Sequence, residues 1–156
     1  MNWKLRVKNG CETPHISILN SYFLILNSFH YFCALQNLAM EPNIIVQKSY
    51  QFALHIIKVY SFLCKEKQEY VLSKQILRSG TAIGALVSES KFAQSKADFI
   101  NKMYIALKEA NETKYWIKLL YDSDFIPEKT FNFMNPKIEE IISILAAIVK
   151  TSKSKN

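Results

Sequence analysis

The stretch DFINKMYIALKEANETKYWIKLL, residues 98–120, carries the clearest periodicity in the chain. A row with steps of four and three lies along one side of an α-helix and forms a continuous seam. Ser95 and Asp98 give a capping-box-like start, and residues 122–124, ahead of Pro127, give an end. The sequence therefore predicts a long helix with one buried side. Its seam residues are Phe99, Met103, Ala106, Ala110, Thr113, Ile117 and Leu120.

Three further segments have helical spacing, at residues 43–65, at 71–92 and from Pro136 onward, where Asn135 is the predicted N-cap. Short connections between four amphipathic helices are typical of an antiparallel up-down four-helix bundle, so we predict an all-α fold over residues 40–156. The predicted seams are Ile45, Ser49, Phe52, Ile56, Val59 and Leu63; Leu72, Ile76, Ser79, Ile83 and Leu86; and Ile138, Ile141, Ile142, Leu145, Ile148 and Val149.

The segment 43–65 has a wider apolar face than a bundle interior needs. A second row, one residue over from the seam, predicts another buried contact, between subunits. This row is Val46, Tyr50, Ala53, Ile57, Tyr60 and Cys64.

A strip of small residues marks the segment RSGTAIGALVSESK, residues 78–91. Gly80, Gly84 and Ser88 are spaced by four, so they share one side of the helix and leave almost no side-chain bulk there. Glycine costs a helix about 1 kcal/mol relative to alanine, which favours a packing reason for its presence. We expect this strip to let the backbone of the helix at 95–122 come close, in preference to a ligand site.

Composition limits the kind of partner more than it identifies one. The formal net charge of +7 permits contact with RNA, DNA or an acidic protein. Only Arg6 and Arg78 among the 20 basic residues are arginines, which favours loose electrostatic attachment over readout of base edges. Cys11, Cys33 and Cys64 have no metal-site spacing, so we expect unpaired thiols in a reducing, cytoplasmic setting.

Residues 1–39 form an N-terminal extension that fits the bundle poorly. Its apolar segment, residues 16–35, follows Lys4, Arg6 and Lys8 but contains Asn20 and His30. Three interpretations stay open: a spurious or disordered extension with Met40 as the start, an extra helix packed on the domain, or a membrane or export segment. We favour the first, and we do not expect a membrane protein.

No catalytic set is visible, and we expect no cofactor, metal or small-molecule substrate. Glu12 and His15 have a metal-ligand spacing but are interrupted by Pro14. His55 has no partner ligands, which favours a packed or half-exposed structural role. Cys64 has no companion for a catalytic dyad, which favours a buried thiol.

Two charged pairs on the segment 95–122 admit both a structural and a functional interpretation. Glu109 and Glu112 lie one turn apart, and ion pairing with residues such as Arg78 is favoured over acid-base chemistry. Lys114 and Lys118 are typical of a solvated face. Neighbouring aromatic residues also leave room for base stacking and phosphate contact; these are Tyr115, Trp116 and Tyr121.

The segments LRSGTAIGALVSES and DFINKMYIALKEANETKYWIKLL resemble the S23-type bacterial proteins from intervening sequences of the 23S rRNA gene. The resemblance covers about residues 43–151 and implies a four-helix bundle that forms a ring-shaped homopentamer without known enzymatic activity. The chain is also similar to the basic, pentameric accessory protein of diversity-generating retroelements, which contacts reverse transcriptase and nucleic acid. The matching positions are Arg78, Ser79, Gly80, Thr81, Ile83, Gly84, Glu89, Asp98, Phe99, Ala106, Glu109, Glu112 and Trp116.

The sequence also departs from the family pattern. Ala82 and Leu86 replace residues that are usually polar or small, Asn135-Pro136 interrupts a normally longer last helix, and residues 1–39 have no counterpart.

The leading hypothesis is a non-enzymatic homo-oligomer, a pentamer by resemblance, that binds RNA or another nucleic acid through a basic surface. The alternative is a scaffold that docks a partner enzyme and has no direct nucleic-acid role. The candidate contacts to nucleic acid are Lys74, Arg78, Lys91, Lys96, Lys114 and Lys118.

Overall fold

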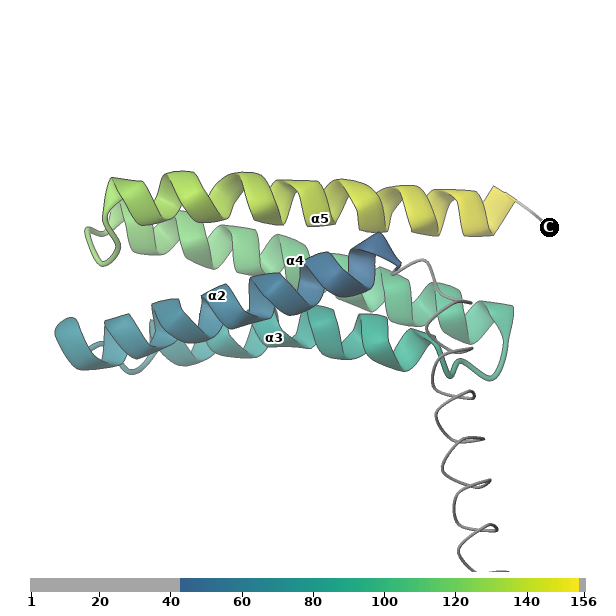
Figure 1. Cartoon of the computed structure of the whole chain (residues 1–156), viewed down its shortest axis with the longest axis horizontal. Helices are drawn as coiled ribbons and strands as arrows, with labels where there is room; N and C mark the ends of the chain where they lie inside the picture. Colours follow the sequence, from purple (N-terminus) through teal and green to yellow (C-terminus); the bar gives the residue numbers. More distant parts are fainter. Residues whose placement is uncertain (1–42, 155–156) are drawn as a thin grey trace, which may run out of the picture. The chain divides into compact units, whose positions relative to one another are not determined.

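Four α-helices make up the part of the chain that is described, residues 43–154 of a computed structural model. They are α2 (Ile44–Glu66), α3 (Leu72–Ser90), α4 (Lys96–Asp122) and α5 (Glu128–Ser154). Successive helices run antiparallel and pack side by side, and the seam between α2 and α5 is the most sparsely packed of the four (Figure 1). The predicted all-α bundle is confirmed. The extension at residues 1–39 lies outside the described residues.

The predicted seams of α2 and α4 are confirmed almost residue for residue. All six seam residues of α2, including Ser49, are buried. In α4, six of the seven predicted seam residues are buried, and the seventh, Phe99, is half-buried at the edge of the core. Both helices start as predicted: the Ile45 N–H donates to Asn43 Oδ1 (3.3 Å) and the Asp98 N–H to Ser95 Oγ (3.1 Å). Periodicity and capping here agree with the tertiary packing.

The seam of α3 was predicted correctly only at its centre. Ile76, Ser79 and Ile83 are buried, whereas Leu72 and Leu86 are half-buried at the edge of the core. Ser73 and Val87 are buried in their place. The difference is one residue at each end, because α3 lies between α2 and α4 and buries more than one row of side chains.

The small-residue strip of α3 faces α2 and not α4, which corrects the predicted partner. A Cβ on Gly80 would lie 2.7 Å from Ile56, and a Cβ on Gly84 would lie 3.5 Å from the Ser49 carbonyl oxygen. Close packing was therefore the right explanation for the glycines. Ser88 is exposed and takes no part in it.

Helix α5 starts at Glu128, eight residues before the predicted start, and continues through Pro136. Pro127 lies immediately before the helix, and its carbonyl accepts from the Thr130 and Phe131 N–H groups (2.9 and 3.2 Å). Asn135, the predicted N-cap, lies inside the helix. Burial of Met134 and stacking of Phe131 on Tyr121, with ring centroids 4.4 Å apart, hold the early turns against the bundle. Tertiary packing thus overrides the helix-breaking tendency of an exposed internal proline.

Candidate functional site

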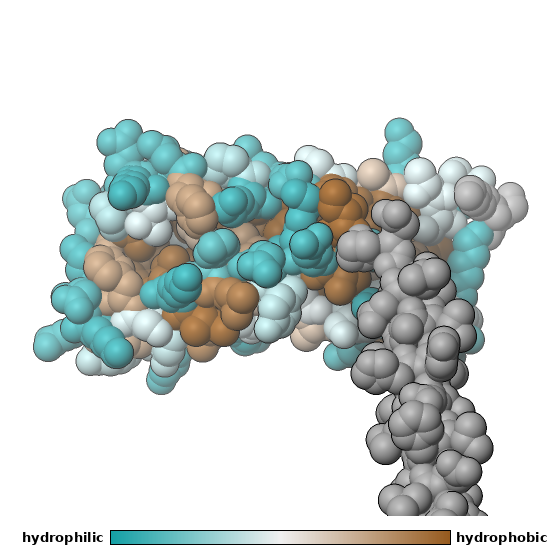
Figure 2. Space-filling view, viewed as in Figure 1, coloured by the Kyte–Doolittle hydropathy of each residue, from teal (hydrophilic) through white to brown (hydrophobic). Residues whose placement is uncertain are grey.

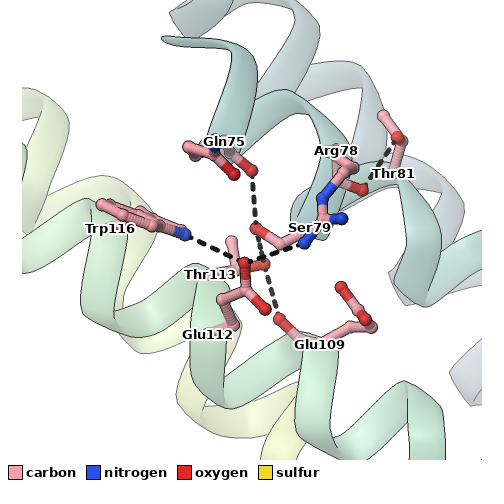
Figure 3. Close-up of polar contacts among 8 residues, drawn as sticks. All are labelled: Gln75, Arg78, Ser79, Thr81, Glu109, Glu112, Thr113 and Trp116. Atoms are coloured by element: carbon pink, nitrogen blue, oxygen red, sulfur yellow. Dashed lines mark hydrogen bonds and ion pairs between the residues drawn. The ribbon is translucent and has the colours of Figure 1, made fainter. Parts of the chain in front are cut away.

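A buried pair of hydroxyl groups joins α3 to α4 at the centre of the family motif. Thr113 Oγ1 lies 2.9 Å from Ser79 Oγ and 2.7 Å from the Glu109 carbonyl oxygen, and Ser79 Oγ lies 3.1 Å from the Gln75 carbonyl oxygen (Figure 3). Both side chains are fully buried. Each hydroxyl therefore has partners within the protein, and the pair serves helix packing.

Beside this pair the Glu112 carboxylate lies between Arg78 and Trp116 (Figure 3). Glu112 Oε1 accepts a hydrogen bond from Trp116 Nε1 (3.2 Å) and lies 3.5 Å from an Arg78 guanidinium nitrogen. The predicted structural pairing of this carboxylate with Arg78 is confirmed. Glu109 contributes its backbone carbonyl to Thr113 and is half-buried. The Glu112 carboxylate thus has two structural partners, whereas the contact of Glu109 with Thr113 is made by its backbone.

Two further motif residues tie the other end of α3 to α4. Lys102 Nζ lies 3.6 Å from Glu89 and 3.7 Å from Asp98. Asp98 also accepts a hydrogen bond from the Gln94 N–H (3.1 Å), so it caps the start of α4 as well. These roles explain Glu89 and Asp98 as structural residues.

Of the six candidate lysine and arginine contacts, three lie on or just after α3 and three on α4. Lys114 Nζ lies 2.7 Å from Glu139 and Lys118 Nζ 2.8 Å from Asp122, so these two and Arg78 have acidic neighbours. The Lys114 ammonium lowers the pKa of Glu139 by hydrogen bonding and by its charge. The other three candidates, Lys74, Lys91 and Lys96, are exposed.

The exposed side of α4 carries a basic and aromatic row that extends beyond the predicted contacts. Tyr104, Lys108, Tyr115 and Lys118 recur in steps of four, seven and three, and all are exposed. Beside this row a hollow of about 430 Å³ is lined by Lys114, Tyr115, Lys118 and Asn135, among others. Tyr104 and Lys108 are four residues apart in the sequence, but this spacing alone does not show that both side chains are exposed.

His55 and Cys64 have the structural surroundings expected of them, with one adjustment. The His55 ring is half-buried and meets the Phe133 ring edge-on, with centroids 4.9 Å apart. The Cys64 thiol is half-buried and not fully buried as predicted, and its sulfur lies 3.7 Å from both the Glu69 carbonyl oxygen and Ser73 Oγ.

Within residues 43–154, no group of three or more His, Cys, Asp or Glu side chains is arranged to hold a metal ion. In the same residues no helix combines the length and hydropathy needed to cross a bilayer.

The sequence model of the 23S rRNA-intervening sequence protein family matches residues 41–147. The chain belongs to this family. A crystal structure of a protein of unknown function from the S23 ribosomal protein family of Bacteroides thetaiotaomicron is 50% identical in sequence, with a TM-score of 0.67. The alignment covers 68% of this chain and 98% of that protein. No curated protein matches.

Within the 23S rRNA-intervening sequence protein family, the quoted motif can now be interpreted physically. Ser79, Gly80 and Gly84 shape the contacts of α3 with its two neighbours. Glu89, Asp98, Glu112 and Trp116 make polar contacts in or around α3 and α4. These motif residues therefore have structural roles in the packing of α3 against its two neighbours.

Proposed function

We propose that the protein is a non-enzymatic, pentameric bundle that binds RNA through many weak phosphate contacts, in the cytoplasm. The pentamer and the nucleic-acid role come from the family resemblance, including the likeness to the accessory protein of diversity-generating retroelements. The observations below support assembly and RNA binding separately, so each can be tested alone.

Assembly is supported by an apolar row on the outer side of α2. Tyr50, Leu54 and Ile57 recur in steps of four and three and are 63%, 38% and 45% exposed. On the face where α2 lies in front, hydrophobic side chains reach the surface between hydrophilic ones (Figure 2). Tyr50 and Ile57 belong to the predicted second row of this helix, and Leu54 lies beside them. Within the described residues these side chains are left exposed, which supports a subunit contact.

RNA binding is supported by one observation above all, the exposed row of tyrosines and lysines on α4. Exposed aromatic rings can stack on bases, while lysines neutralise phosphates without reading sequence. The bundle domain has a net charge of about five, because the extension holds a surplus of two positive charges, and assembly would multiply this modest charge. Weak contacts that repeat around a ring would then add up to useful affinity.

A filter-binding titration of labelled poly(U) over a range of salt concentrations tests the proposal. We expect binding at low salt that falls steeply as salt rises, because phosphate contacts release counterions. Tyr115→Ala with Lys118→Ala should weaken binding about tenfold, since stacking contributes about 1–3 kcal/mol per base. Phe92→Ala with Lys150→Ala, on other exposed surfaces, should bind like the parent protein. Retention that does not depend on salt, or no retention at all, contradicts the proposal.

A second function, docking of a partner protein, is favoured by a different observation. The seam between α2 and α5 is open to solvent along its length. Pull-down before and after nuclease treatment separates the two functions, because a docked protein survives the nuclease and an RNA-bridged one does not.

A further inference from the structure

A groove made of successive hollows follows the seam between α2 and α5. Two hollows share His55: one of about 330 Å³ reaches back to Ile44, and the other, of about 430 Å³, reaches forward to Phe62. From Ile44 to Phe62 the groove extends about 27 Å along α2, at 1.5 Å per residue. The two helices also diverge toward the Glu66 end of α2 (Figure 1). The groove is therefore long and narrow, and its second half is the wider one.

The wider half is apolar along its base and its edges. Val59 and Met134, which belong to the core, line it and are almost fully buried. Phe62 and Phe133 line it from opposite helices and remain 36% and 48% exposed. Aromatic side chains left exposed on both edges of one hollow are typical of a surface that a partner covers.

The same half of the groove has an uncompensated positive charge. Lys58 and Lys129 line it, and no carboxylate is among the residues that line it. Lys137 Nζ lies over the Phe133 ring, 4.5 Å from its centroid. Burial first, and then the charges of Lys137 and Lys58, lower the pKa of His55. The other hollow does contain a carboxylate, and there Lys48 Nζ lies 2.9 Å from Glu140 across the seam.

We propose that this groove binds an amphipathic helix of a partner protein, with apolar side chains between Phe62 and Phe133 and acidic residues beside Lys58 and Lys129. The length suits a helix of about 18 residues, whereas a small molecule would fill only one hollow. RNA could meet the lysines but would leave the apolar base uncovered. A second copy of the chain fits the groove less well than a helix with acidic flanks. Its exposed apolar row on α2 has Lys58 beside it, and this lysine would meet the lysines of the groove. The groove lies on a different side of α2 from Tyr50 and Leu54, so it does not depend on the proposed assembly.

Selection from a displayed library of random 18-residue peptides on the full-length protein tests this inference without a known partner. We expect enrichment of Leu, Phe and Met at helical spacing, flanked by Asp and Glu. The consensus peptide is then titrated by fluorescence anisotropy. Phe133→Ser, and separately Lys58→Glu with Lys129→Glu, should each weaken its binding at least tenfold. The matched surface variants Phe92→Ser and Lys74→Glu should leave it unchanged.

Three results would overturn the inference. The first is a selection that yields no consensus or a basic one. The second is a consensus peptide whose binding is unchanged by the groove variants. The third is a fall in the native mass of Phe133→Ser, which would place a sister chain in the groove. Should Phe133→Ser fail to fold by circular dichroism, the double lysine variant decides alone, because both lysines are exposed.

Discussion

At the scale of single residues, the hydroxyl pair of Ser79 and Thr113 is a fully buried polar contact between α3 and α4. Removing one partner leaves a buried hydroxyl with fewer hydrogen bonds, at a cost of about 1–2 kcal/mol. We expect Thr113→Val and Ser79→Ala each to lower the free energy of unfolding by that amount. The double variant should lose less than the sum, because the shared contact is removed only once. Urea denaturation of the four proteins measures the coupling, and strict additivity would contradict it.

Glu69 supplies another residue-scale prediction, because its carboxylate caps α3 in place of a conventional N-cap side chain. It accepts from the backbone N–H groups of Val71, Leu72 and Ser73 at 2.8, 2.8 and 2.6 Å. Burial acts to raise the pKa of Glu69, but these hydrogen bonds outweigh it, so the pKa lies below the ordinary value of 4.5.

A carboxylate whose pKa is lowered in the folded state stabilises the fold at pH values above its unfolded-state pKa. This contribution is lost as the pH falls through the folded-state pKa. We therefore expect Glu69→Gln to be less stable than the parent by about 1 kcal/mol at pH 7. The gap should narrow as the pH falls below about 4.5. Thermal denaturation of both proteins at pH 7, 5 and 3 measures it. A gap that is constant with pH would show that the charge of the cap is irrelevant.

At the scale of helices, Gly80 and Gly84 have different tolerances although both lie on the same strip. The nearest atoms to a Cβ on Gly80 all belong to Ile56, which is fully buried and stiff at its branched Cβ. Gly80→Ala should therefore destabilise the protein by about 1–3 kcal/mol, despite a helix-propensity gain of about 1 kcal/mol.

Gly84→Ala is the matched control, because its Cβ would make only an ordinary 3.5 Å contact with Ser49. It should be neutral or stabilise by up to about 1 kcal/mol. Gly84→Leu should separate α2 from α3 and disrupt folding or assembly. Chemical denaturation ranks the three variants, and equal stabilities of the two alanine variants would contradict the difference in packing.

Pro136 interrupts the backbone hydrogen bonds of α5, so its replacement should stabilise this helix. Pro lacks the N–H that would donate to the carbonyl of Asn132, and both residues are exposed, so water can hydrate that carbonyl. We expect Pro136→Ala to raise the free energy of unfolding by about 1–3 kcal/mol. Guanidinium denaturation measures the change. A loss of stability would mean that the packing of α5 requires the proline.

The helices also show which kinds of feature could be predicted from sequence. The seams of α2 and α4 were predictable because each is a single regular row. The start of α5 was not, because Pro127 and Pro136 both suit a first turn and only the contacts of Phe131 and Met134 decide between them. The helix that packs on the glycine strip could not be predicted either, because residue spacing identifies one side of a helix but not the neighbour that packs against it.

At the scale of the whole molecule, the described surface divides into three features with different chemistry. The outer side of α2 is apolar, the groove between α2 and α5 is apolar with basic edges, and the exposed side of α4 is basic and aromatic. Sequence reasoning anticipated the first from the surplus apolar row, and part of the third from Lys114, Tyr115 and Lys118. It missed the groove, because a groove depends on how two helices far apart in the chain diverge.

Assembly through α2 leads to the last prediction. Leu54→Lys with Ile57→Glu places charges where a sister chain would bury apolar side chains, yet both residues are exposed within one chain. We expect this variant to stay helical, to sediment as a monomer and to lose any dependence of its melting temperature on protein concentration, because assembly stabilises by mass action. Val71→Lys with Phe92→Glu, at residues 70% and 84% exposed just before and just after α3, should keep the native mass. A parent protein that is itself monomeric, or a variant that keeps the native mass, would rule out this face as the subunit contact.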